Sequence, residues 1–174
     1  MPTEVKGAIA LRKALRQFAP ELGKETQKEI ASFLKPVVRQ ARGYMPSNAD
    51  VPSGWVAGTQ KGKWERIAYD STLARRGIGY KTTPSRANRR GFQALASILN
   101  KSAAGAIYET AGRKSGIQGR FTPKLGGQLA GQGQKMTGRA MFRAYAEDEG
   151  KAKAHVIQAI FNAANKLNMR AYRG

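Results

Sequence analysis

The chain has 174 residues, and its 31 Lys and Arg outnumber its 11 Asp and Glu, which gives a formal net charge of +20. This length predicts a single domain of residues 1–174 with a modest core. The absence of Cys and the presence of one His exclude a disulfide framework, Cys-ligated metal sites and multi-His sites. The sequence has no secretory signal pattern and no apolar run of ~20 residues, so it predicts a soluble protein with no membrane partner.

The N-terminal segment, residues 3–43, is predicted to be helical. Apolar residues recur at steps of three and four from Ala8 to Ala41, which places them along one helix face. Pro20 and Pro36 interrupt this pattern. Because a proline inside a helix removes a hydrogen bond, we expect a kink or a restart at each. Pro20 is also suited to the first position of a second helix.

The middle of the chain, residues 44–111, is predicted to hold short strands and basic loops. Phe92–Leu99 fits either a short helix or a buried strand, and its Leu and Ala content favours the helix. The expected strands are rich in aromatic and β-branched residues and bounded by glycine. They are Trp64–Tyr69, Ile78–Lys81 and Ala106–Glu109.

Two contrasting segments complete the chain. Residues 112–138 are so rich in Gly, Gln and Lys that they cannot bury enough side chain to offset their ordering entropy, which predicts a flexible, basic loop. Residues 144–170 have the apolar spacing of a helix. The acids Glu147–Asp148–Glu149 precede its apolar stripe, where carboxylates favour a helix N-terminus. Consecutive residues on a helix point in different directions, so these acids are not expected to converge on one metal ion.

Clustered arginines are the best candidates for contact with a partner. Guanidinium groups suit phosphate geometry, and the nearby aromatic residues Tyr69, Tyr80 and Phe92 are suited to stacking on bases. A solvated basic face or an acidic protein neighbour explains the same pattern equally well. No helix-turn-helix, zinc-finger or RNA-binding motif is present, so any nucleic-acid contact is expected to be phosphate-directed and salt-dependent. The candidate contact residues are Arg75, Arg76, Arg86, Arg89, Arg90, Arg113, Lys114 and Arg120.

Catalytic and cofactor sites are not predicted. The string at Gly112–Ser115 lacks the spacing of a phosphate-binding loop, because Ile107 and Arg113 occupy the positions of its glycine and lysine. His155 has no partner set for hydrolysis and is expected to be a surface or interface residue. We therefore expect neither an enzyme nor a bound metal, cofactor or small-molecule substrate.

The order of three segments resembles a known family. VVRQARGYMPSNA ends the N-terminal helix, GAIYETAG follows as a short strand, and MTGRAMFRAYAEDEGKAKAHVIQAIFNAANKL leads into the closing helix. This layout resembles the neck or tail-completion proteins of long-tailed double-stranded DNA bacteriophages, the minor structural proteins of the head-to-tail junction. The chain departs from the family pattern in two features. Thr110 and Ala111 follow Glu109 where an aromatic residue and glycine are usual, and Ala140 replaces a common proline.

The resemblance implies an α+β protomer in which long N-terminal and C-terminal amphipathic helices pack on a small antiparallel sheet. It further implies a ring, commonly six-fold, that is made in the host cytoplasm and placed in the virion between head-connector and tail proteins. The Gly-rich loop at 112–138 and the basic cluster Arg75–Arg90 would contact neighbouring subunits, adjacent rings or the packaged DNA. The alternative is a stand-alone, sequence-nonspecific nucleic-acid-binding protein.

Overall fold

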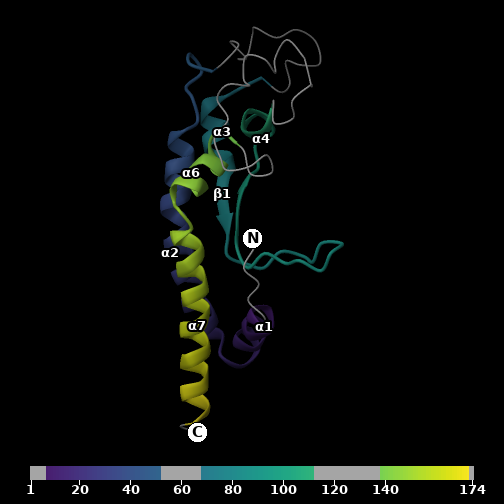
Figure 1. The fold of residues 1–174 in the computed structure, drawn as a ribbon, viewed down its shortest axis with the longest axis vertical. Coiled ribbons are helices and arrows are strands. Elements are labelled where there is room, and N and C mark those ends of the chain that lie inside the picture. Colours follow the sequence, from purple (N-terminus) through teal and green to yellow (C-terminus); the bar gives the residue numbers. More distant parts are fainter. Residues whose placement is uncertain (1–6, 52–67, 112–137, 173–174) are drawn as a thin grey trace. The chain divides into compact units, whose positions relative to one another are not determined.

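The computed structural model describes residues 7–51, 68–111 and 138–172 (Figure 1). Within these ranges the chain forms six helices and one two-stranded antiparallel sheet, which confirms the α+β class. The chain divides into two compact units, and each is described by itself. Unit 1 comprises Met1–Lys35, Tyr80–Ser97 and Gly150–Gly174, and unit 2 comprises Pro36–Gly79 and Ile98–Glu149. The single domain therefore stays a prediction. The predicted loop at 112–138 lies outside the described residues except for Gly138.

Two helices account for the N-terminal segment. Helix α1 spans Ala8–Phe18 and helix α2 spans Pro20–Gly43, so Pro20 opens a second helix as predicted. Of the kink or restart predicted at Pro36, the restart does not occur, because α2 continues through this residue. Pro36 is exposed, while Leu34 and Val37 on either side of it are buried, so apolar packing continues along the helix past the missing hydrogen bond.

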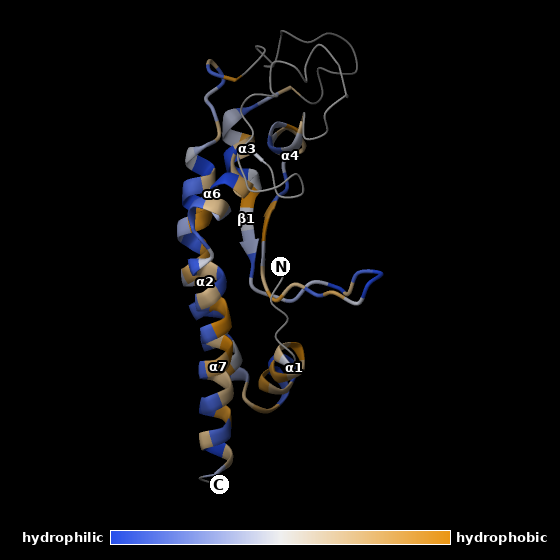
Figure 2. Ribbon diagram, in the orientation of Figure 1, coloured by the Kyte–Doolittle hydropathy of each residue, from blue (hydrophilic) through white to orange (hydrophobic). Residues whose placement is uncertain are grey.

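The core of unit 1 joins the two ends of the chain. Helix α7, Lys151–Ala171, packs against α1 and the start of α2. Both α1 and α7 carry apolar residues along one side, visible as orange segments in Figure 2. The sequence predicted these helices from the same recurrence of apolar residues at steps of three and four. The residues of this cluster are Leu11, Leu15, Ala19, Leu22, Ala163 and Leu167.

The predicted helix at 144–170 is two helices. Helix α6, Met141–Glu147, ends before α7 begins at Lys151. Glu149 and Gly150 have positive φ values of 54° and 81°, which helical backbone does not adopt. The predicted placement of the acidic triplet in the first turn of the closing helix is also wrong. That first turn has no acidic residue, and Glu147 instead ends α6.

Unit 2 contains a helix where a strand was predicted. Helix α4, Ala103–Thr110, includes all of Ala106–Glu109. Its N-terminus is capped by Ser102, whose hydroxyl accepts a hydrogen bond from the Gly105 N–H at 3.2 Å. Burial of its residues follows helical rather than alternating spacing, and the helix packs against α3, Ser71–Gly77. The local preference of Ile and Tyr for strands is therefore overridden by the cap and by packing.

The sheet is smaller than predicted. Strand β1, Ile78–Lys81, has the predicted bounds and pairs with β2, Ser97–Asn100. The helix favoured for Phe92–Leu99 is wrong, because only the end of this segment is regular and it joins β2. Of the predicted strand at Trp64–Tyr69, positions 64–67 lie outside the described residues, and Tyr69 is in an isolated β-bridge. No helix in the described part of the chain has the length and apolar character needed to cross a membrane.

Candidate functional site

The candidate contact residues that the structure describes are divided between the two units. Arg75 and Arg76 lie on α3 in unit 2, whereas the arginines at positions 86, 89 and 90 lie in unit 1. Positions 113, 114 and 120 lie outside the described residues. Arg75 uses part of its donor set within unit 2, where its Nε and Nη2 donate to the Met45 carbonyl at 3.3 and 2.8 Å. Arg76 lines a cavity of about 460 Å³ together with Asp70 and Lys101.

Residues Thr82–Ala96 of unit 1 form an extended arm, the teal hairpin between β1 and β2 in Figure 1. Its tip is organised by Asn88, whose Oδ1 accepts hydrogen bonds from the N–H groups of Arg90 and Phe92, both at 2.9 Å. The Gly91 N–H donates to the Asn88 carbonyl at 2.9 Å, and Gly91 has a φ of 75°. These bonds close a tight turn that fixes the backbone of the tip.

The tip of the arm is basic and exposed. The side chains of Arg86, Arg89 and Arg90 are all exposed, and the neighbouring Phe92 keeps 51% of its surface accessible. No Asp or Glu occurs between positions 71 and 108 of the sequence. Within the part of the chain that the structure describes, no ion pair engages these three guanidinium groups. Among the described residues, the arm therefore presents positive charge that no ion pair offsets.

A fourth arginine, Arg12 on α1, anchors the base of the arm. Its Nη1 donates to the Leu95 carbonyl at 2.6 Å, and its Nη2 donates to the Thr82 carbonyl. Arg12 thus joins both strands of the arm to the helix. Burial lowers the pKa of the Arg12 guanidinium, and the charge of Arg16 lowers it further. Sequence analysis missed this role because the partners are backbone carbonyls 70 and 83 residues away.

Replacement of Arg12 by methionine is expected to loosen the arm, because the apolar side chain cannot donate to either strand. Limited trypsin digestion followed by mass spectrometry of the first fragments should show cleavage after Arg86, Arg89 or Arg90 at least about threefold faster than in wild type. Arg16→Met is the matched control, since Arg16 is exposed on the same helix and lacks these bonds. Equal cleavage rates in the two variants would contradict the anchoring role.

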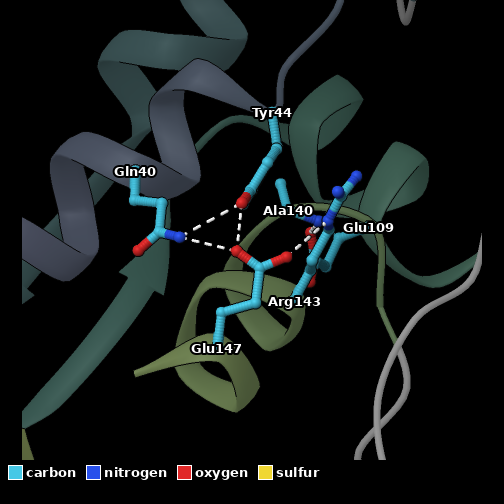
Figure 3. Close-up of polar contacts among 6 residues, drawn as sticks. All are labelled: Gln40, Tyr44, Glu109, Ala140, Arg143 and Glu147. Atoms are coloured by element: carbon cyan, nitrogen blue, oxygen red, sulfur yellow. Dashed lines mark hydrogen bonds and ion pairs between the residues drawn. The ribbon is translucent and has the colours of Figure 1, made fainter. Parts of the chain in front are cut away.

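In unit 2, two buried charged residues tie α4 to α6. Glu109 is fully buried, and its Oε2 accepts hydrogen bonds from the Ala140 and Met141 N–H groups at 2.8 and 3.1 Å. Its Oε1 accepts one from the Phe142 N–H at 2.9 Å. Figure 3 places this carboxylate against the backbone of Ala140. Since the first N–H groups of a helix have no partner within it, Glu109 caps the N-terminus of α6.

Arg139 makes the reciprocal contacts. Only 2% of its surface is exposed, and its guanidinium donates to the Tyr108 and Ala111 carbonyls at 2.5 and 2.7 Å. These carbonyls lie at the C-terminus of α4, where cations and donors stabilise the helix. Burial lowers the pKa of Arg139, while the nearby Tyr108 and Glu109 raise it. We call Glu109 and Arg139, with the two helix ends that they cap, the reciprocal cap.

A second polar cluster, at the surface of unit 2, joins α2 to α6. Glu147 accepts hydrogen bonds from the Tyr44 hydroxyl and, at 2.6 Å, from the Gln40 amide, and it pairs with Arg143 at 2.9 Å (Figure 3). The Arg143 guanidinium also lies 4.1 Å from the centroid of the Tyr44 ring. These contacts, first the bond from Tyr44 and then that from Arg143, hold the pKa of Glu147 below its ordinary 4.5.

This depressed pKa predicts how stability depends on pH. The contribution of Glu147 is complete above the unfolded-state pKa near 4.5 and is lost as pH falls through the lower folded-state pKa. Glu147→Gln should therefore lower the urea midpoint by more at pH 7 than at about pH 3, where part or all of the carboxylate is protonated. A difference between the two proteins that is the same at both pH values would show that the carboxylate charge is not involved.

The structure assigns no catalytic or metal-binding role to His155 or to the described acidic residues. His155 is exposed on α7 and stacks on Phe33, with ring centroids 4.6 Å apart. Among the described residues, no group of three or more His, Asp or Glu side chains could hold a metal ion. The arm is therefore the surface in the described ranges whose charge and exposure most strongly indicate contact with a partner.

Comparisons of the chain with protein-family models, with curated protein sequences and with solved structures find no match.

Proposed function

We propose that this chain is a structural protein of the head-to-tail connection of a long-tailed, double-stranded DNA bacteriophage. It acts as a neck, tail-completion or tail-terminator component, forms a ring, commonly six-fold, around the DNA channel, and contacts head-connector and tail proteins. It catalyses no reaction and needs no cofactor. Its place is the virion, after synthesis in the host cytoplasm.

The observation that most supports the proposal is the reciprocal cap. Glu109 comes from the mid-chain segment GAIYETAG and Arg139 from the segment that opens with MTGRAMF, and both segments belong to the family resemblance. In the folded chain each caps a helix in the other segment. Each of these two residues, 30 positions apart, bonds backbone groups that would otherwise lack a partner at a helix end in the other segment. This mutual dependence explains why the two motifs occur together in one chain.

One feature of the resemblance is corrected. The mid-chain segment expected as a strand is helix α4, so the sheet has only β1 and β2 within the described residues. The finer arrangement remains part of the proposal: the long helices pack on the small sheet, and the Gly-rich basic loop at 112–138 meets neighbouring subunits. The coarser α+β class is compatible with it.

Deletion of the gene from a phage genome that carries it tests the proposal. We expect infected cells to accumulate filled heads and finished tails that do not join, and expression of the wild-type chain from a plasmid should restore joined particles. A deletion phage that still forms normal, infectious particles would overturn the proposal.

The second candidate function, a stand-alone nucleic-acid-binding protein, is favoured by the exposed arginines of the arm. The two candidates differ in assembly. A neck protein should form a discrete ring in native mass spectrometry and be present in purified virions, whereas a stand-alone binder should be absent from particles.

A further inference from the structure

The acidic residues that the structure describes in unit 1 lie on α2. Glu21, Glu25 and Glu29 recur every four residues, which places them on one face of the helix. Two of them contact α7, where Lys166 Nζ pairs with Glu25 at 2.5 Å and the Asn162 amide donates to Glu29 at 3.4 Å. Helix α1, residues 80–97 and helix α7 contain no Asp or Glu. Glu25 and Glu29 therefore compensate charge on the side of α2 near α7, and among the described residues no ion pair engages the cations of α1 or the arm.

A basic groove lies beside the base of the arm. A cavity of about 400 Å³ is bounded by α1, the first turns of α2 and Pro84 of the arm. Its apolar lining includes Ile9, Leu15 and Pro20, and none of the described residues that line it is acidic. Its cations are Arg12, Lys13, Arg16 and Lys24, of which all but Arg12 are exposed.

The groove and the arm are continuous. Pro84 belongs to both, and Arg12, which lines the groove, donates to the carbonyls of Thr82 and Leu95 at the base of the arm. The groove, with three exposed cations, and the arm, with three more at its tip, therefore adjoin in unit 1, and we treat them as one surface. We call it the arm–groove surface. Its six residues are Lys13, Arg16, Lys24, Arg86, Arg89 and Arg90.

We propose that the arm–groove surface binds the phosphate backbone of double-stranded DNA without reading its sequence. The proposal rests on the proposed function and names one partner of the basic arm in that assembly. DNA carries one phosphate charge per ~1.7 Å of helix axis, so a row of cations can engage several phosphates at once. The three exposed cations of the groove extend the contact beyond the arm residues that the sequence singled out.

A second copy of this chain is a poor match for the surface. Each copy has only 11 Asp and Glu against 31 Lys and Arg, so it offers few carboxylates to a surface of six cations. Several of its few carboxylates are already engaged, since Glu109 is buried, Glu25 pairs with Lys166, and Glu147 pairs with Arg143. These three carboxylates are therefore not available to the cations of a second copy.

An acidic protein is also a weaker match than DNA. The centre of a protein–protein interface is depleted in charge and rich in aromatic residues. The tip of the arm instead presents three arginines and a single large apolar side chain, Phe92. Phosphate contacts need no apolar centre, and the exposed Phe92 ring is suited to pack on a sugar or a frayed base.

The test uses the full-length chain and a fluorescein-labelled duplex of random sequence, with binding followed by anisotropy between 50 and 200 mM NaCl. For six phosphate contacts, the wild-type log–log slope should be about −5. The triple variant R86Q/R89Q/R90Q should bind roughly 30-fold more weakly at 100 mM NaCl, with a slope reduced by about 2–3. The groove variant K13Q/R16Q/K24Q should behave similarly, because its three cations are assigned to the same surface.

A matched control removes equal charge from elsewhere. K28Q/K35Q/R39Q changes three exposed cations of α2 that do not line the groove, and it should lose less than about fivefold in affinity. Circular dichroism melts confirm that each variant is folded. The proposal is overturned by equal losses in control and arm variants, by wild-type binding that is independent of salt, or by tighter binding to poly-glutamate or to RNA of equal length.

The wild-type protein and the arm and groove variants also test the DNA contact and the proposed function separately. Native mass spectrometry of the arm and groove variants should show the wild-type ring mass, because their changes remove DNA contacts only. Wild-type protein that binds DNA as described but forms no ring and is absent from virions would overturn the proposed function and support the DNA contact. A ring that does not bind DNA would overturn the DNA contact alone.

Discussion

Gly138→Ala is expected to destabilise unit 2 by about 3 kcal/mol or more, measured as the loss of unfolding free energy in urea. A Cβ atom at position 138 would lie 2.6 Å from Cδ2 of Phe142 and 2.9 Å from Cδ of Glu109, and it would also clash with Oε1 of that carboxylate. Glu109 cannot move aside without losing its bonds to the N-terminus of α6. The substitution therefore acts on the reciprocal cap as a whole.

Gly43→Ala is the matched control for this prediction. Gly43 is the last residue of α2, and a Cβ atom there meets nothing within 4 Å. Because alanine favours helix more than glycine, this change should be neutral or stabilise by up to about 1 kcal/mol. Equal urea midpoints for the two variants would show that the space at Gly138 is not restricted.

Glu109→Gln is expected to cost about 2–3 kcal/mol although it changes the shape of the side chain very little. Three backbone N–H groups donate to the two carboxylate oxygens, so a glutamine must place its NH₂ group against at least one of these donors. The substitution also leaves Arg139 buried without the opposite charge nearby.

Hydrogen exchange localises the effect of Glu109→Gln. The amides of Ala140, Met141 and Phe142 should lose protection first, while amides in the middle of α7 keep theirs. Glu21→Gln removes the same charge from an exposed position on α2 and should cost no more than about 0.5 kcal/mol. Unchanged protection at positions 140–142 would contradict the capping role of Glu109.

Local patterns predicted the elements whose stability depends on local spacing. The apolar steps of α1, α2 and α7 repeat over several turns, and the β-branched and aromatic residues of β1 are bounded by a glycine. Pro20 at the start of α2 follows from the properties of proline alone. The strand predicted at Ala106–Glu109 is wrong because Ser102, four residues upstream, caps a helix there. The packing of this helix against α3 also stabilises it, and a short window of sequence does not contain that contact.

Some residues of the candidate site could likewise be predicted from the local sequence, and others could not. The exposure of Arg86, Arg89 and Arg90 could be predicted from charge density, because three arginines without nearby acids are costly to bury. The roles of Arg12 and Arg139 could not, since both donate to backbone carbonyls, which have no signature in the sequence. Arg75 shares this property, and its bonds to the Met45 carbonyl distinguish it from the arginines of the arm.

Quantitative mass spectrometry of purified virions, combined with electron microscopy of particles labelled on this chain, tests the central claim most directly. We predict a low, fixed copy number, six or a small multiple of it, and a label confined to the junction between head and tail. Mature, infectious particles that lack the chain, or a label spread over the capsid or the tail tip, would contradict the claim.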